Sequence, residues 1–152
     1  MKLHIELVPR TAWGTSLSKQ LKASDWGKIR HLALANQNSC CHTCGQVVKS
    51  LDAHEIWEFD EEHHIQKLVG IVGVCKPCHN TIHFGRAQKI GFGKEAITQF
   101  LTVNQCGLVD FQNECDEARI HFNRLNLVKT WALDISWIQE SLNFPLKDLS
   151  LP

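Results

Sequence analysis

The sequence predicts an α+β domain, and three features of the chain support this class. Apolar residues recur at helical spacing in two segments, 24–35 and 109–125. Between them, residues 46–74 contain short runs rich in β-branched and aromatic residues, which favour strands. A pair of cysteines stands on each side of that central part. We therefore expect a small β-containing core over residues 40–84, flanked by N- and C-terminal helices.

Length and composition indicate how this core is embedded in the chain. The chain has 152 residues, of which 43% are hydrophobic, so it can bury one core. We expect a single domain over 1–152, with a basic strand and helix region at 1–39 and a helical extension at 85–152. No apolar run is long enough to span a membrane, and the N-terminus does not begin a signal peptide. A cytoplasmic location without membrane contact is the resulting expectation.

The region before the first cysteines is expected to hold one strand and two helices. Leu3–Val8 alternates like an edge strand, and Pro9 would end it. Thr15–Leu21 is long enough for one or two helical turns. A better helix runs from Ser24 or Asp25, either of which can cap its N–H groups, to about residue 35.

The central part predicts two short strands, a return strand and a helix. Gln46–Lys49 and Leu51–Trp57 read as strands, Phe59–His64 as an acid-rich loop, and Leu68–Val74 as the return strand. A helix starts at Lys76-Pro77, because proline is tolerated at the first helical position.

This helix is expected to end by Phe84, where Gly85 would supply a C-terminal glycine. Beyond it, residues 94–103, 109–125 and 127–139 are expected to be helices. Trp131 and Trp137, in the last of these, are assigned to packing.

Four of the seven cysteines predict a structural zinc site. Cys41-x-x-Cys44 and Cys75-x-x-Cys78 have the spacing with which thiolates bind Zn²⁺ in a reducing compartment. Gly45 would relieve the backbone after the first pair. The remaining cysteines, Cys40, Cys106 and Cys115, are interpreted as small apolar residues, although Cys40 adjoins the first pair and could compete as a ligand.

Three histidines predict a second metal site. His79 and His83 are four residues apart and share one helical face, and His54 from the preceding hairpin can face them. Three imidazoles leave an open coordination position on a divalent ion for a phosphate oxygen or water. The alternative is that His83 caps carbonyls at the helix end and that His79 is an incidental neighbour of the zinc site.

The formal net charge is zero, but the charges are unevenly distributed. Residues 1–50 carry seven lysines or arginines against two acids, and residues 51–84 carry two against six. A basic face for nucleic acid would consist of Arg10, Lys19, Lys22, Lys28 and Arg30, joined by Arg86, Lys89 and Lys94 after the core. These side chains could equally serve only to solvate helix surfaces.

The ordered pattern Cys41-x-x-Cys44-Gly45, Ala53-His54-Glu55-Ile56 and Cys75-x-x-Cys78-His79-x-x-x-His83 resembles the HNH endonucleases in their zinc-containing form. This family belongs to the ββα-metal, or His-Me finger, superfamily. The resemblance implies a treble-clef-like ββα-metal core in which the four cysteines hold a structural zinc. It further implies one catalytic divalent ion (Mg²⁺, Mn²⁺, Ni²⁺ or Zn²⁺) that hydrolyses DNA phosphodiester bonds. DNA would be the partner, with a homodimer or a partner protein left open.

Carried over residue by residue, the resemblance makes His54, His79 and His83 metal ligands and Glu55 the general base. In the other register, Ala53 would replace a ligand and His54 would be the base. We prefer the first register because it keeps three imidazoles on the metal. The asparagine that family members carry before the second cysteine pair has no counterpart near Val69-Gly70.

A second class of function stays open. The chain could be a non-catalytic treble-clef zinc module that binds nucleic acid or protein. The substitution at Glu55 and the missing asparagine favour this alternative. The three histidines oppose it, because a purely structural fold has no use for a second cluster of ligands.

Overall fold

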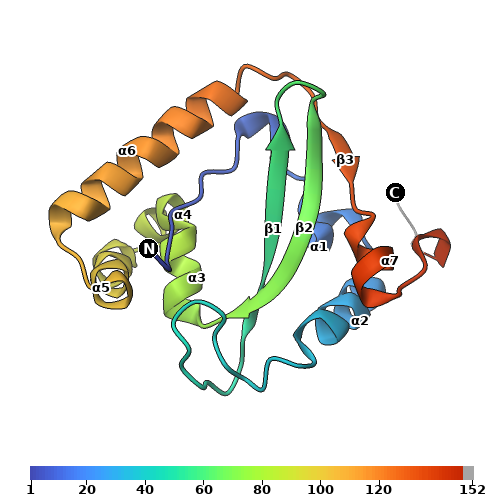
Figure 1. Ribbon diagram of the computed structural model, residues 1–152, viewed down its shortest axis with the longest axis horizontal. Helices are drawn as coiled ribbons and strands as arrows, with labels where there is room; N and C mark the ends of the chain where they lie inside the picture. The colour runs from blue at the N-terminus through green and yellow to red at the C-terminus, as the bar shows by residue number, and fades with distance from the viewer. Residues whose placement is uncertain (149–152) are drawn as a thin grey trace.

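The computed structural model describes residues 1–148 and has an α+β fold with one small sheet (Figure 1). In chain order the elements are η1 (Arg10–Ala12), α1 (Leu17–Gln20), α2 (Ala23–Leu34), β1 (Asp52–Asp60), β2 (Ile65–Val74), α3 (Lys76–Ile82), α4 (Phe84–Lys89), α5 (Gly93–Asn104), α6 (Leu108–Leu125), β3 (Ala132–Asp134), α7 (Trp137–Leu142) and η2 (Leu146–Asp148). The α+β class expected from the sequence is therefore confirmed. No helix of the described residues is long and apolar enough to cross a membrane.

The sheet is a long antiparallel hairpin with one added strand. Strands β1 and β2 pair along their whole length, and β3 pairs in parallel with the start of β2, so that β1 is an edge strand. Because successive side chains of a strand point to opposite faces, His54 and Glu55 of β1 lie on different faces of the hairpin. Their partners across the hairpin are Val72 and Ile71, respectively.

Each face of the hairpin is covered by its own set of helices (Figure 1). On one face, Val74 packs with helices α3 to α6 in a core that includes Ile82 and Phe100. On the other face, Leu68 and Ile71 pack with α1, α2 and α7. The histidines belong to the first face and Glu55 to the second.

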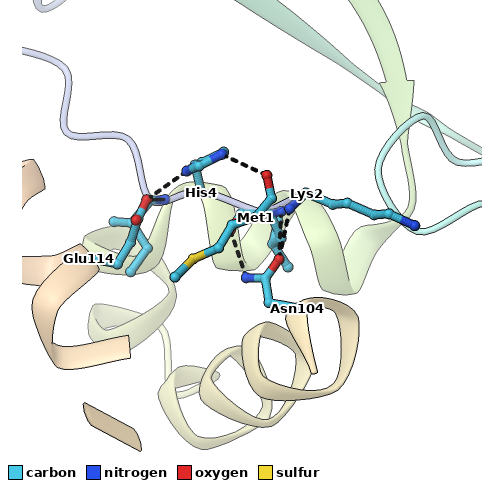
Figure 2. A network of polar contacts seen from close by, with 7 residues as sticks. Met1, Lys2, His4, Asn104 and Glu114 are labelled. Atoms are coloured by element: carbon cyan, nitrogen blue, oxygen red, sulfur yellow. Dashed lines mark hydrogen bonds and ion pairs between the residues drawn. The ribbon is translucent and has the colours of Figure 1, made fainter. Parts of the chain in front are cut away.

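The N-terminal segment is not the edge strand expected at Leu3–Val8. Its backbone has no strand partner and is held instead by side chains of α5 and α6 (Figure 2). The Asn104 amide oxygen accepts the Lys2 and Leu3 N–H groups at 2.9 and 3.0 Å. Glu114 contacts His4 Nδ1 at 3.0 Å and accepts the Ile5 N–H at 3.1 Å. Sequence alternation missed these contacts because they join residues more than a hundred positions apart.

The expected helix at 127–139 is also wrong, because the chain there forms β3 and then α7. The Asp134 carboxylate accepts the Ser136 N–H at 2.9 Å and turns the chain from strand into helix. The C-terminal extension expected at 85–152 thus completes the sheet, and its residues 149–152 lie outside the described residues. Trp131 and Trp137 do pack, Trp131 edge-on against Phe59 at 4.9 Å between ring centroids.

Three smaller expectations need correction near the core. Gly85 does not end the first helix, because it lies inside α4 and the break between α3 and α4 is at His83. Strand β1 continues to Asp60, so the acid-rich loop shrinks to a short turn. The predicted strand at 46–49 is reduced to one bridge between Val47 and Cys40. Helices α2, α5 and α6 begin and end within a residue or two of their expected bounds.

Candidate functional site

The four cysteines of the two C-x-x-C pairs meet in one cluster, hereafter the four-cysteine cluster. The Sγ atoms of Cys41, Cys44, Cys75 and Cys78 all lie within 4.8 Å of one another. A tetrahedral zinc with Zn–S bonds of about 2.3 Å requires sulfurs about 3.8 Å apart. The sulfurs of Cys44 and Cys75 are 3.7 Å apart. The cluster could therefore hold a structural metal ion.

The backbone around the first cysteine pair explains how the two pairs come together. The Gln37 amide bonds both the N–H and the carbonyl of Gly73 near the end of β2, and so ties the turn before Cys41 to the strand before Cys75. A Cβ on Gly73 would lie 2.9 Å from the Gln37 amide nitrogen and 2.7 Å from the Leu51 side chain, so a larger residue here would displace these side chains and with them the Gln37 contact. Gly45 has a φ of +77°, the left-handed conformation expected after the first pair.

Hydrogen bonds to sulfur prepare the cluster for metal. The Cys75 N–H donates to Cys41 Sγ at 3.2 Å, and Gln99 Nε2 donates to Cys78 Sγ at 3.2 Å. Burial raises the pKa of Cys41, but N–H groups of Cys44, Cys75 and Thr43 outweigh this and lower it to about 7. Burial raises the pKa of Cys75 to about 11. One sulfur is thus readily a thiolate, which is the form that binds zinc.

The other three cysteines stand apart from the four-cysteine cluster. Cys40 does not compete as a ligand in this geometry, because its thiol donates to the Gly45 carbonyl at 3.0 Å. Cys106 and Cys115 are partly buried and pack against the core on the α3 side, as expected for small apolar residues.

The three histidines form a second cluster, hereafter the histidine cluster. His54 lies on β1, His79 on α3, and His83 directly after α3. One ring nitrogen from each lies within 4.8 Å of the others, and the ring centroids are 5.0 to 5.7 Å apart. The sequence spacing thus brings all three rings to one place. Their geometry could hold a second metal ion.

A carboxylate fixes the orientation of His79. Asp52 Oδ2 lies 2.9 Å from His79 Nδ1 and 3.2 Å from Lys76 Nζ. Burial raises the pKa of Asp52, but the bonds from His79 and Lys76 outweigh this and lower it. A proton held on Nδ1 by this carboxylate leaves the Nε2 lone pair free, as in the carboxylate–histidine–metal arrangement of protein metal sites.

Glu6 contacts the histidine cluster and was missed by the sequence reasoning. Its Oε1 lies 3.3 Å from His54 Nε2, and its N–H donates to the Ile82 carbonyl at 2.8 Å. Burial raises the pKa of Glu6, but His54 and His83 outweigh this and lower it. No sequence signal could have found this residue, because its segment resembles an ordinary strand and lies 48 positions before His54.

Burial favours the neutral form of His79 and His83. It lowers the pKa of His79, and with the neighbouring His54 and His79 it lowers that of His83 to about 4. Neutral imidazole is the form that ligates metal. The reading of His83 as a mere carbonyl cap is not favoured by this geometry, because its ring lies 5.3 Å from that of His54.

Glu55 is placed differently from the histidines. Its side chain starts on the other face of β1, where Oε1 accepts the Leu17 N–H at 2.9 Å and Oε2 accepts the Trp57 indole N–H at 3.0 Å. Burial raises the pKa of Glu55 although these two bonds lower it. Because β1 is an edge strand, Glu55 still lines the same cleft as the histidines.

This cleft, hereafter the histidine cleft, has a volume of about 520 Å³. Besides the histidines and Glu55 it is lined by Glu6, Trp13, Lys19 and Arg86, among others. A second, larger hollow of about 900 Å³ adjoins it and adds Arg30 and Lys76.

The basic residues expected to form one face lie in several separate places. Lys19, Arg30 and Arg86 line these two hollows, and Lys89 lines a third that shares Glu6, His83 and Arg86. Arg10 instead lies over the Phe122 ring, 5.5 Å from its centroid. Lys94 lines a separate depression near α4 and α5.

No family model, curated protein or solved structure matches this chain.

Proposed function

We propose that this chain is a metal-dependent endonuclease that hydrolyses DNA phosphodiester bonds through an HNH-type site. The observation that carries the proposal is the histidine cluster beside, and separate from, the four-cysteine cluster. Under this proposal β1, β2 and α3 form a treble-clef-like ββα-metal core with zinc on the cysteines. The catalytic divalent ion, Mg²⁺, Mn²⁺, Ni²⁺ or Zn²⁺, would be held by His54, His79 and His83.

The division of ligands between the clusters supports this assignment. Four thiolates fill a tetrahedral zinc, so a structural site needs nothing further from the chain. Three imidazoles leave coordination positions open, which a hydrolytic site requires. The chain nevertheless buries His54 to 5% exposure and places Asp52 and Glu6 against two of the rings. Such outer carboxylates orient metal ligands.

The charges around the cleft suit a phosphodiester substrate. A divalent ion in the histidine cluster would supply a Lewis acid for a phosphate oxygen and neutralise the charge that develops there. Lys19, Arg30 and Arg86 would attract and position the DNA backbone without reading its sequence.

Glu55 would take the proton of the attacking water in this proposal. Each of its oxygens accepts one hydrogen bond and so keeps a further lone pair. Its raised pKa is the change that a carboxylate base needs to work near neutral pH.

The alternative function is a non-catalytic treble-clef zinc module that binds nucleic acid or protein. One observation favours it: both oxygens of Glu55 are already bonded, to Leu17 and to Trp57. In that case Glu55 would serve to hold α1 on the hairpin rather than to move a proton.

A plasmid assay separates the two functions. Purified protein is incubated with supercoiled DNA in Mg²⁺, Mn²⁺ or Ni²⁺, beside His54→Ala and His79→Ala proteins and an EDTA control. We expect nicking by the wild type alone, with one zinc per chain retained in both variants. If the wild type fails to nick with every metal, or if both variants nick equally well, the chain is not an enzyme of this kind.

A further inference from the structure

Trp13 is an exposed aromatic side chain with a fixed orientation. It follows η1, and 64% of its surface is exposed. Its indole N–H donates to the Val8 carbonyl at 2.9 Å, so the ring is held in place although its surface meets solvent. The ring is therefore both open to solvent and restricted in orientation.

Trp13 also stands next to the histidine cluster. It lines the histidine cleft together with His54, His79 and His83. It lines as well a neighbouring hollow of about 370 Å³ that contains Arg86, Lys89 and Phe122. Trp13 therefore lines two hollows. One of them holds the histidines, and the other holds the side chains of Arg86 and Lys89.

The charges of the two hollows favour a polyanion over a basic or neutral partner. Among residues 1–148, the ion pairs made by lysine and arginine use Lys76, Arg119 and Arg124, and so leave Lys19, Arg86 and Lys89 without an acidic partner. The acids of the histidine cleft are engaged inside the protein. Glu6 contacts His54, and Glu55 accepts bonds from Leu17 and Trp57.

We propose that Trp13 is a stacking platform for an unpaired base, and that the histidine cleft takes single-stranded or locally unpaired DNA. This inference rests on the proposed function and narrows its substrate. In a regular duplex both faces of each base are covered by neighbouring bases, so a fixed tryptophan face beside Arg86 and Lys89 finds no partner there. Aromatic platforms within a basic groove are the means by which proteins bind single strands of any sequence.

Binding of labelled DNA tests this inference without any need for cleavage. Fluorescence anisotropy is measured in buffer without added divalent ion on three labelled DNAs. The first is a duplex, the second is the same duplex with a short unpaired stretch, and the third has abasic sites throughout that stretch. We expect the unpaired stretch to raise the affinity about tenfold, and removal of its bases to cancel the gain.

Two variants of Trp13 and one control complete the test. Trp13→Leu keeps an apolar side chain without an aromatic face, and should lower the affinity for unpaired DNA about tenfold while leaving duplex binding unchanged. Trp13→Phe should keep most of the preference. Phe92, which is 48% exposed and lies outside both hollows, serves as the control through Phe92→Ala.

Each outcome separates this inference from the nuclease itself. Equal affinity for paired and unpaired DNA, an equal loss for both in Trp13→Leu, or no loss in that variant overturns the stacking role even if plasmid is nicked. A preference for unpaired DNA that Trp13→Leu abolishes upholds it even if no metal supports nicking. The stacking role is also overturned if the chain binds no DNA and binds only a protein.

Discussion

The four-cysteine cluster and the histidine cluster share one scaffold, the β1–β2 hairpin with α3, but they differ in their surroundings. Three of the four cysteines are at most 2% exposed, and N–H groups donate to their sulfurs. The histidines open into a cleft, and a carboxylate contacts one ring nitrogen of His79 and another contacts one of His54. A closed, thiolate-rich site suits a structural ion, and an open imidazole site suits one that meets a substrate. Loss of a ligand should therefore lower stability at the four-cysteine cluster and lower activity at the histidine cluster.

Loss of a cysteine ligand should have the largest effect, and it should fall on stability. Cys78→Ser removes a completely buried sulfur from the four-cysteine cluster. Structural zinc contributes on the order of 10 kcal/mol, comparable with the total stability of a domain. We expect the bound zinc to be lost and the chain to unfold at room temperature, as measured by metal analysis and circular dichroism.

Cys40→Ser is the matched control for this change. Its sulfur lies one residue before the cluster but bonds the Gly45 carbonyl, so zinc content should stay at wild-type levels. Equal melting temperatures for the two variants would show that the four-cysteine cluster does not hold the fold.

Loss of a histidine ligand should instead lower activity and leave stability nearly unchanged. Under the proposed function, His79→Ala should lower plasmid nicking about 100-fold or more, because the catalytic ion would lose one of its three imidazoles. The melting temperature and the zinc on the cysteines should change little. His42→Ala, an exposed histidine beside Cys41, should leave nicking intact. A large loss of zinc in His79→Ala would contradict the separation of the two sites.

Glu55→Gln tests whether the carboxylate acts in chemistry or in the fold. The amide oxygen can still accept one of the Leu17 and Trp57 N–H groups, but the amide NH2 can accept neither and the side chain cannot take a proton. A general base contributes about 100-fold or more, so nicking should fall by that factor while the chain stays folded, with a modest fall in melting temperature from the one lost hydrogen bond. Glu58→Gln, at an exposed position of the same strand, is the control. Undiminished nicking in Glu55→Gln would remove Glu55 from the mechanism.

The two clusters also differ in how far the sequence predicted them. The cysteine pairs were found from local spacing, because a C-x-x-C turn brings two sulfurs together wherever it folds. His79 and His83 were found in the same way, from one turn of helix. His54 could be paired with them because the hairpin between the cysteine pairs must return to the helix.

The surroundings of the histidine cluster could not be predicted, because they come from distant segments. Glu6 reaches His54 from an N-terminal segment that Asn104 and Glu114 hold against α5 and α6 (Figure 2) and that bonds the Ile82 carbonyl. The missed strand β3 has the same cause, since only its pairing with β2 selects strand over helix there. Local sequence patterns predict turns and helix faces. They do not predict which distant segment will pack beside them.

Asp52→Asn should weaken metal binding at the histidine cluster. The amide keeps the shape of the side chain but loses the charge that fixes the His79 tautomer. The affinity of the histidine cluster for Mn²⁺ or Ni²⁺ should fall about tenfold, measured by calorimetric titration. The control is Asp60→Asn, which removes a similar aspartate–histidine contact, of 2.8 Å to His63, at the exposed end of the same strand. An equal change in both variants would show a general charge effect.

Glu6→Ala should have the smallest effect of the series. Its carboxylate is 45% exposed and its contact with His54 is 3.3 Å long, against 2.9 Å between Asp52 and His79. We expect a loss of about threefold in metal affinity, again by calorimetric titration. The comparison variant is Asn104→Ala, which frees the backbone of Leu3 without changing the histidine cleft.

These two variants distinguish the carboxylate from the segment that carries it. If Glu6 acts by contacting His54, Glu6→Ala lowers metal affinity at an unchanged melting temperature, and Asn104→Ala lowers the melting temperature first. If both variants lower the metal affinity and the melting temperature together, the packing of the N-terminal segment supports the histidine cluster. The Glu6 carboxylate then makes no separate contribution to metal binding. The histidine cluster would then depend on Asp52 alone for its outer carboxylate, and its metal affinity would be encoded almost entirely within residues 52–83.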